Sequence, residues 1–146
     1  MGALADSALA AGGEVVGIIP QFLARHELAH HGLTERIRVD SMHDRKRQMS
    51  ELADAYLVLG GGFGTTDELF EILTWKQMGL HDKPIVICNV NGTWDPLFQL
   101  IIQMRDAGFV RESHLDLLDW ASEAATAVET LERAPRASGN VASKLT

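Results

Sequence analysis

Residues 56–75 read YLVLGGGFGTTDELFEILTW, and this stretch predicts a buried strand, a glycine loop and the first turns of a helix. The first four residues are apolar and favour a strand, without helical periodicity. Four of the next five residues are glycines, which permit positive φ angles and a close approach of a ligand to the backbone. Thr65 and Glu68 have the spacing of a capping box. The N–H groups at such a helix start bind anions, so we predict a phosphate site here.

The glycine loop matches neither of the two common phosphate motifs. A P-loop requires a lysine after the glycines, and this sequence has none there. The dinucleotide fingerprint requires a third glycine at the position that Thr65 occupies. The pattern therefore indicates an anion at a helix start without saying which anion. The alternative interpretation is a tight strand-to-helix turn in which Glu68 only caps the helix.

The composition is that of an acidic globular domain. A chain of 146 residues fits one domain, and its net charge of −7 argues against a nucleic-acid polymer or an anionic membrane as partner. No apolar run is long enough to cross a membrane, and the N-terminus lacks the basic segment of a signal peptide. The single cysteine, Cys88, lies in an apolar run and is expected to be a buried thiol. We expect a cytoplasmic protein without a cofactor.

Predicted strands and helices alternate along the chain. Strands are expected at residues 15–19, 36–40, 56–59, 84–89 and 115–120, and helices at residues 1–11, 42–54, 65–79, 95–107 and 121–132. This alternation predicts an α/β fold with a parallel sheet and helices on both faces, in which ligands bind at the carboxyl ends of the strands. The apolar run at 15–19 is typical of a strand buried on both faces. Residues 1–134 would form the domain, and residues 135–146 a disordered tail.

A histidine-rich segment raises the possibility of a zinc site. Residues 26–30, HELAH, match the zinc-protease motif H-E-x-x-H. Such a site needs a long helix and a third ligand downstream. Gly32 would end the helix early, and Leu33 stands where the metzincin extension has glycine. We therefore expect a polar loop without a metal and keep a zinc peptidase as a distant alternative.

The predicted helix at residues 42–54 places a cation on its buried face, with Ser41 as the expected N-cap. Four residues follow the spacing of one face: Met42, Arg45, Met49 and Leu52. Lys46 lies at the margin of this face. A guanidinium in a buried stripe needs an anionic partner, either a protein carboxylate or a ligand phosphate. Because this helix leads into the strand before the glycine loop, we favour the ligand.

These segments together resemble the Lonely Guy family of cytokinin riboside 5′-monophosphate phosphoribohydrolases, whose members are often mislabelled lysine decarboxylases. Residues 60–68, GGGFGTTDE, are similar to the family motif P-G-G-x-G-T-x-x-E, with glycine in place of proline. Residues 42–46, MHDRK, are similar to a second family motif, an Arg-Lys pair in a helix that begins Met-His. Residues 74–97 also resemble the family throughout, and the resemblance covers residues 1–134.

The resemblance implies a Rossmann-like homodimer that hydrolyses the N-glycosidic bond of AMP or of a cytokinin riboside monophosphate, which releases free base and ribose 5-phosphate. It assigns Glu68 to the sugar and Arg45 to the leaving base as catalytic residues. Glu27, the central residue of the HELAH match, would bind substrate rather than serve a protease. The implied substrate-binding residues are Glu27, Lys46, Gly61, Gly62, Phe63, Gly64, Thr65, Thr66, Asp67 and Thr74.

One departure from the family leaves competing hypotheses. Family members carry two further strands before the position of Met1, so we expect the sheet to lack them. A non-catalytic nucleotide-binding module or an inactive fragment is the alternative to an enzyme. Arg45 and Glu68 are both present, which favours the enzyme. Nothing resembles a pyridoxal-phosphate lysine site, so we do not expect a decarboxylase.

Overall fold

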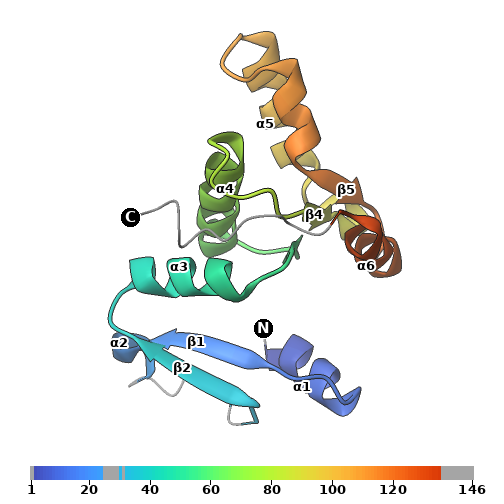
Figure 1. The fold of residues 1–146 in the computed structure, drawn as a ribbon. Coiled ribbons are helices and arrows are strands. Elements are labelled where there is room, and N and C mark those ends of the chain that lie inside the picture. Colours follow the sequence, from blue (N-terminus) through green and yellow to red (C-terminus); the bar gives the residue numbers. More distant parts are fainter. Residues whose placement is uncertain (1, 25–29, 31, 136–146) are drawn as a thin grey trace. The chain divides into compact units, whose positions relative to one another are not determined.

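The computed structural model describes residues 2–24, 30 and 32–135, and the chain divides into two compact units (Figure 1). The first unit is Met1–Leu52, and the second is Ala53–Thr146. Every strand pair in the described residues is parallel, and helices connect the strands in both units. The predicted Rossmann-like α/β class is therefore confirmed.

The first unit contains a two-stranded parallel sheet. Its elements are α1 (Gly2–Ala10), β1 (Val16–Pro20), α2 (Gln21–Ala24), β2 (Glu35–Val39) and α3 (Met42–Leu52). Strand β1 lies beside β2 with Ile18 opposite Ile37, and α3 packs on both strands. Helix α1 ends just before Gly12, whose φ of +81° favours glycine.

Strand β1 is more exposed than its sequence predicts. Val16 is 45% exposed, and only Pro20 of the five residues is buried. The expectation of a strand buried on both faces is wrong here, because a two-stranded sheet covers little of either strand.

The second unit contains a three-stranded parallel sheet in the order β3-β4-β5. Its elements are β3 (Tyr56–Val58), α4 (Phe63–Gln77), β4 (Ile85–Cys88), the 3₁₀ turn η1 (Val90–Gly92), α5 (Asp95–Asp106), the 3₁₀ helix η2 (Glu112–Leu117), β5 (Asp119–Ala121) and α6 (Ala124–Arg133). No helix in the described part of the chain is both long enough and apolar enough to cross a membrane.

Strand β4 is the centre of the second unit, and its side chains alternate between two hydrophobic clusters. Ile85 and Ile87 belong to a cluster with residues of α4 and α5, whereas Val86 and Cys88 belong to a cluster with α6. Burial of each of these aliphatic side chains stabilises the fold by about 1.5–3 kcal/mol. Helices therefore cover both faces of this sheet, and Cys88 is a buried thiol, as the sequence predicts.

The last predicted strand is shorter than expected. Only residues 119–121 pair with β4, and most of the preceding apolar run forms η2. Leu115 and Leu118 still pack against the cluster on the α4 side. The apolar pattern thus identified buried residues correctly, but a short apolar run does not distinguish a strand from a 3₁₀ helix.

Candidate functional site

The glycine loop, residues 59–62, joins the carboxyl end of β3 to the start of α4. Gly62 is the N-cap of α4, and no described side chain caps this end. The first backbone hydrogen bond of the helix runs from the Thr66 N–H to the Gly62 carbonyl, at 3.1 Å. The N–H groups of residues 62–65 therefore have no acceptor within the helix, and they lie at the positive end of its dipole.

The predicted capping box of Thr65 and Glu68 is wrong. Helix α4 begins at Phe63, so Thr65 is its third residue and Glu68 its sixth. Thr66, and not Thr65, bonds back to the loop, because its Oγ1 donates to the Gly62 carbonyl at 3.1 Å. Glu68 lies too far inside the helix to cap it, so the interpretation of this carboxylate as a helix cap is wrong.

The loop glycines are not explained by backbone angles. None of Gly60, Gly61, Gly62 and Gly64 has a positive φ, so the conformation that glycine permits is not used here. Gly61 is required by packing, since a Cβ there would collide with the Thr65 side chain. A Cβ at Gly62 or Gly64 would meet no described atom within 4 Å. At these two positions a ligand could approach the backbone without meeting a side chain.

The side chains beside the loop differ in exposure. Phe63 is 97% exposed, Asp67 is also exposed, and Thr65, Thr66 and Glu68 are half-buried. Residues three and four apart share a helix face, so Glu68 lies on the same face as Gly64 and Thr65. The structure therefore brings the predicted residues 61–68 together at one end of α4.

Arg45 and Lys46 lie in the first unit, at successive positions of α3, and both are half-buried. Ser41 is the predicted N-cap, and its Oγ accepts the Asp44 N–H at 3.0 Å and donates to Asp44 Oδ2 at 2.6 Å. The hydrogen bond from Ser41 and the nearby Arg47 cation outweigh desolvation and lower the pKa of the Asp44 carboxyl. These two reciprocal hydrogen bonds fix the residue at which α3 starts, and hence the positions of Arg45 and Lys46 along it.

The buried face of α3 differs from the predicted stripe. Its one fully buried residue among those described is Ser50, whereas Leu52, predicted to be buried, is 59% exposed. Leu52 is the last residue of the helix, where the periodic pattern no longer guarantees burial.

Glu27 and most of the HELAH match lie outside the described residues. His30 is described, and its Nε2 bonds Asp6 Oδ1 at 2.8 Å while its Nδ1 accepts the Gly32 N–H at 3.1 Å. Both ring nitrogens of this histidine thus have partners in the first unit. Over residues 2–24, 30 and 32–135, no group of three His, Cys, Asp or Glu side chains could hold a metal ion.

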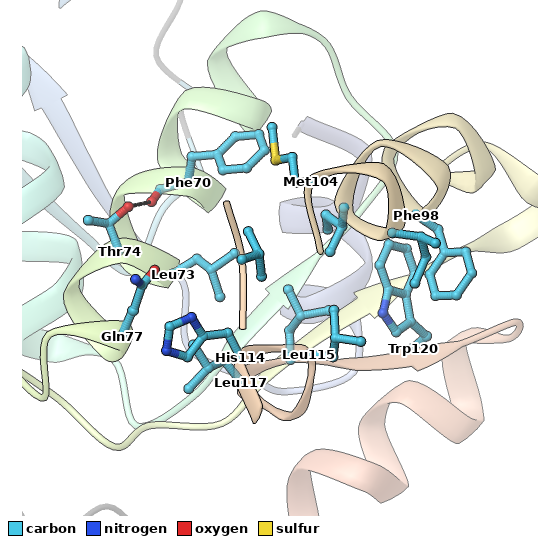
Figure 2. A pocket seen from close by; sticks show the side chains of 14 residues that line it. Phe70, Leu73, Thr74, Gln77, Phe98, Met104, His114, Leu115, Leu117 and Trp120 are labelled. Carbon is cyan, nitrogen blue, oxygen red and sulfur yellow. Dashed lines mark hydrogen bonds between the residues drawn. The ribbon is translucent and has the colours of Figure 1, made fainter. Parts of the chain in front are cut away.

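Thr74 lies apart from the glycine loop. It is ten residues beyond Gly64, which is about 15 Å along the helix, and its Oγ1 donates to the Phe70 carbonyl at 2.6 Å. Thr74 instead lines an apolar pocket of about 400 Å³ that α4, α5 and η2 enclose (Figure 2). Figure 2 shows Thr74, Gln77 and His114 at one end of the pocket, and Phe98 and Trp120 at the other. The sequence analysis missed this pocket, because its walls come from three separate segments.

A buried histidine at the amino end of the sheet was also missed. His81 is 3% exposed, and its ring lies 5.4 Å from that of Tyr56, the first residue of β3. Its Nε2 bonds the Ile72 carbonyl at 2.8 Å, and its Nδ1 accepts the Lys83 N–H at 3.2 Å. Burial lowers the pKa of His81. These bonds fit the neutral imidazole with the proton on Nε2.

Comparison with known proteins places these features in a family. The family model described as "Possible lysine decarboxylase" matches residues 1–131. A cytokinin riboside 5′-monophosphate phosphoribohydrolase from Rhodococcoides fascians is 51% identical over 111 residues, which cover 75% of this chain and 56% of that protein.

Plant proteins are similar over more of the chain. An Arabidopsis thaliana protein with the same description is 39% identical over 132 residues, 90% of this chain and 62% of its own length. A probable member from Oryza sativa subsp. japonica is 34% identical over 145 residues, 99% of this chain and 59% of its own length. The chain thus spans between 56% and 62% of the length of these three curated relatives.

Proposed function

The chain belongs to the family described as possible lysine decarboxylase, and on this premise we propose that it is a phosphoribohydrolase. It would hydrolyse the N-glycosidic bond of a nucleoside 5′-monophosphate, AMP or a cytokinin riboside monophosphate, to free base and ribose 5-phosphate. The names of the curated relatives support this activity. The observation that carries it is the pair Gly62 and Gly64, whose missing side chains serve neither φ nor packing within the described protein.

The substrate phosphate would bind at the start of α4. Its oxygens would accept the N–H groups of residues 62–65, which have no acceptor within the helix. A side chain at Gly62 or Gly64 would occupy the space through which a phosphate reaches this backbone. The positive end of the helix dipole supports an anion here even though the whole chain carries a net charge of −7.

Glu68 would act on the sugar. Its place on the same helix face as Gly64 puts its carboxylate on the side of the proposed phosphate site. When the glycosidic bond breaks, its electron pair leaves with the base, and positive charge develops at the sugar carbon. A carboxylate can stabilise that charge or orient the water that adds to the carbon. The base nitrogen takes up a proton as it departs.

The remaining assignments rest on the sequence resemblance. We propose that Arg45 polarises the departing base, and that Lys46 and Glu27 help to bind the nucleotide. Gly61, Phe63, Thr65, Thr66 and Asp67 belong to the same loop and helix start and are proposed to contact the substrate. Thr74 would contact it only through the apolar pocket, so it is the assignment that the fold of α4 supports least.

We also propose that the protein is a cytoplasmic homodimer. Phe98 and Leu100 on α5 and Phe109 just beyond it are exposed, and Phe98 also lines the apolar pocket. Exposed apolar patches of this kind mark protein interfaces. Sedimentation of the purified chain tests the proposal, because Phe109→Glu should give monomers without loss of folding. Wild-type chain that sediments as a monomer at all concentrations would contradict it.

The experiment that tests the activity measures free base. Purified chain is incubated with AMP, with isopentenyladenosine 5′-monophosphate and with adenosine, and the base is quantified by chromatography. We expect base from the two monophosphates and none from adenosine, which lacks the phosphate. Binding of a monophosphate without release would identify a nucleotide-binding module instead. CO₂ released from lysine would favour the decarboxylase in the family description.

A further inference from the structure

Trp94 carries a buried hydrogen-bond donor for which the described residues offer no acceptor. The residue is 6% exposed, and its Nε1 is fully buried and has no bonding partner among them. Buried indole N–H groups normally find an acceptor. Leaving one without an acceptor destabilises the fold, whereas a phenylalanine would fill most of the same space without this cost. The indole nitrogen therefore calls for an explanation beyond packing.

Trp94 is held in place by its backbone. Its N–H donates to Asn89 Oδ1 at 2.7 Å, and the Asn89 N–H donates to the Ala121 carbonyl of β5 at 2.7 Å. The Trp94 carbonyl accepts the Phe98 N–H at 3.0 Å and so starts α5. The indole is thus anchored to the carboxyl ends of β4 and β5.

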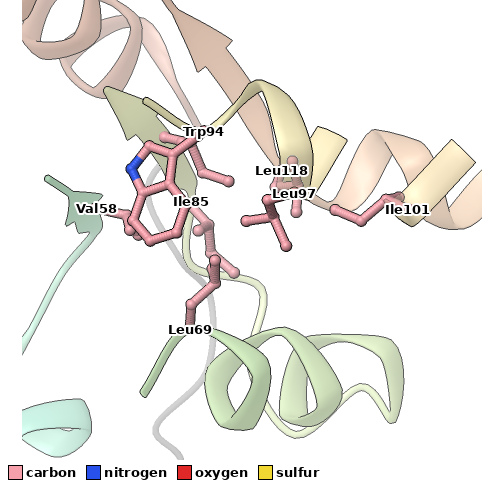
Figure 3. Close-up of a cluster of buried hydrophobic side chains, with 8 residues drawn as sticks. Val58, Leu69, Ile85, Trp94, Leu97, Ile101 and Leu118 are labelled. Atoms are coloured by element: carbon pink, nitrogen blue, oxygen red, sulfur yellow. The ribbon is translucent and has the colours of Figure 1, made fainter. Parts of the chain in front are cut away.

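The indole belongs to the same hydrophobic cluster as residues that precede and follow the glycine loop. Trp94 shares a hydrophobic cluster with Val58, the last residue of β3, and with Leu69, in the second turn of α4. Figure 3 shows the indole nitrogen on the side of Val58, away from Leu97 and Ile101. A Cβ at Gly60 would lie 3.6 Å from the side chain of Thr93, the residue before Trp94. Residues 93 and 94 thus lie near Gly60 and the last residue of β3, and the indole nitrogen faces that side of the cluster.

A trans peptide group explains why a donor is needed there. Its N–H and C=O point to opposite sides. When N–H groups of the glycine loop turn outward to a phosphate, the carbonyls of the same peptide groups turn inward. A carbonyl that faces the interior needs a donor. The glycines of the loop permit such a rotation, because they have no Cβ to restrict their backbone angles.

We propose that Trp94 is a positioning residue of the glycine loop, and that its Nε1–H donates to the backbone carbonyl of Gly61, which shares a peptide group with the Gly62 N–H, when a phosphate binds at the start of α4. The proposal rests on the proposed function, because it needs a phosphate-bearing substrate at this loop. Trp94 does not touch the substrate. It stabilises the loop conformation that presents the N–H groups, so removing its N–H should weaken binding by about three- to ten-fold, the value of one neutral hydrogen bond.

The first test observes the indole N–H directly. Protein labelled with ¹⁵N has three tryptophans, Trp75, Trp94 and Trp120, whose indole N–H signals are assigned with Trp75→Phe and Trp120→Phe. On titration with AMP, or with inorganic phosphate alone, we expect the Trp94 indole proton to move downfield and to exchange more slowly with water. A Trp94 signal that stays unchanged while the amides of residues 62–65 move would overturn the proposal.

The second test compares two tryptophan variants by their dissociation constants for AMP. Trp94→Phe should bind three- to ten-fold more weakly, and Trp75→Phe, from the same unit but outside the glycine loop, should bind like wild type. If Trp94→Phe lowers the unfolding midpoint but leaves the dissociation constant unchanged, the role of Trp94 is only structural and the proposal fails. Wild-type protein in which AMP and phosphate move no signal contradicts the proposed function itself, so the two failures are distinguishable.

Discussion

The polar groups at the two ends of the three-stranded sheet differ in whether they have hydrogen-bond partners within the described protein. At the amino end, both ring nitrogens of His81 have partners inside the protein, the Ile72 carbonyl and the Lys83 N–H. At the carboxyl end, the start of α4 has no side-chain cap among the described residues, and the Trp94 indole nitrogen has no described acceptor. His81 at the amino end thus has partners for both ring nitrogens, whereas the helix start and the indole nitrogen at the carboxyl end have no described side-chain cap or acceptor.

This difference separates polar groups that stabilise from those that are available to bind. The glycines differ in the same way. A Cβ at Gly61 would collide with the Thr65 side chain, whereas a Cβ at Gly62 or Gly64 would meet no described atom within 4 Å. Substitutions at the carboxyl end should therefore change binding and catalysis, and substitutions at the amino end should change stability. Variants at the two ends, taken from the largest expected effect to the smallest, distinguish effects on binding and catalysis from effects on stability.

The largest effect is expected at Glu68. Glu68→Gln should lower the rate of base release at least about a thousand-fold, because it removes the charge that stabilises the developing cation. The free energy of unfolding should change by no more than about 1 kcal/mol, since glutamine keeps the size of the side chain and can still form hydrogen bonds. Rates and urea unfolding are measured beside Glu132→Gln, an exposed carboxylate on α6. A Glu68→Gln variant with the wild-type rate would remove this residue from the mechanism.

Two glycine substitutions test whether Gly64 serves phosphate binding and Gly61 serves packing. Gly64→Ala should weaken AMP binding by about ten-fold, yet stabilise the fold by about 0.5–1 kcal/mol, since alanine is the better helix former. Gly61→Ala should destabilise the fold, because its Cβ would collide with Thr65. Calorimetric titration and thermal unfolding of both variants give the two quantities. Unchanged AMP affinity in Gly64→Ala would mean that the phosphate does not bind at this helix start.

The smallest effect is the pH dependence that His81 gives to stability. Burial lowers its pKa below the ordinary value of 6.5, so the unfolded chain binds the proton more readily than the folded chain. The contribution is complete above pH 6.5 and is lost as the pH falls towards the lower folded-state pKa, by at most about 1.4 kcal/mol per pH unit. Urea unfolding between pH 7.5 and 5.5 measures this slope.

Two histidine variants identify the source of that slope. His81→Gln should lose most of it, whereas His43→Gln, at an exposed position of α3, should keep the wild-type slope. Equal slopes in the two variants would show that His81 does not carry the acid sensitivity.

The sequence predicted the α/β class, the order of the elements and the glycine loop, because these follow from local patterns. The predicted helices at 65–79 and 95–107 end close to the observed ends of α4 and α5, where Gly79 and Gly108 have φ values of +71° and +78°. The start of α4 was misplaced, because glycines are poor helix formers and the first turn needs no intrahelical N–H bond. Local patterns thus locate elements better than they locate element ends.

The parts of the site that escaped prediction depend on tertiary contacts. The N–H of Trp94 is conspicuous only once its surroundings are known to lack an acceptor. His81 is placed by a carbonyl nine residues earlier, and no motif describes that contact. The substrate roles of Arg45, Glu68 and the loop residues stay predictions, to be decided by the kinetic experiments above.

Strand β4 links the stability of the glycine loop to a helix on the far face of the sheet. Its four residues alternate between the cluster of α4 and α5 and the cluster of α6. Neither face can open without exposing the other side of the same strand, so the second unit should open to hydrogen exchange as one cooperative block. A cavity-forming or overpacking change at Ala127, fully buried on α6, would therefore speed amide exchange in α4 as well. Mutations remote from the loop could in this way lower activity, because they reduce the fraction of molecules in which the second unit is fully folded.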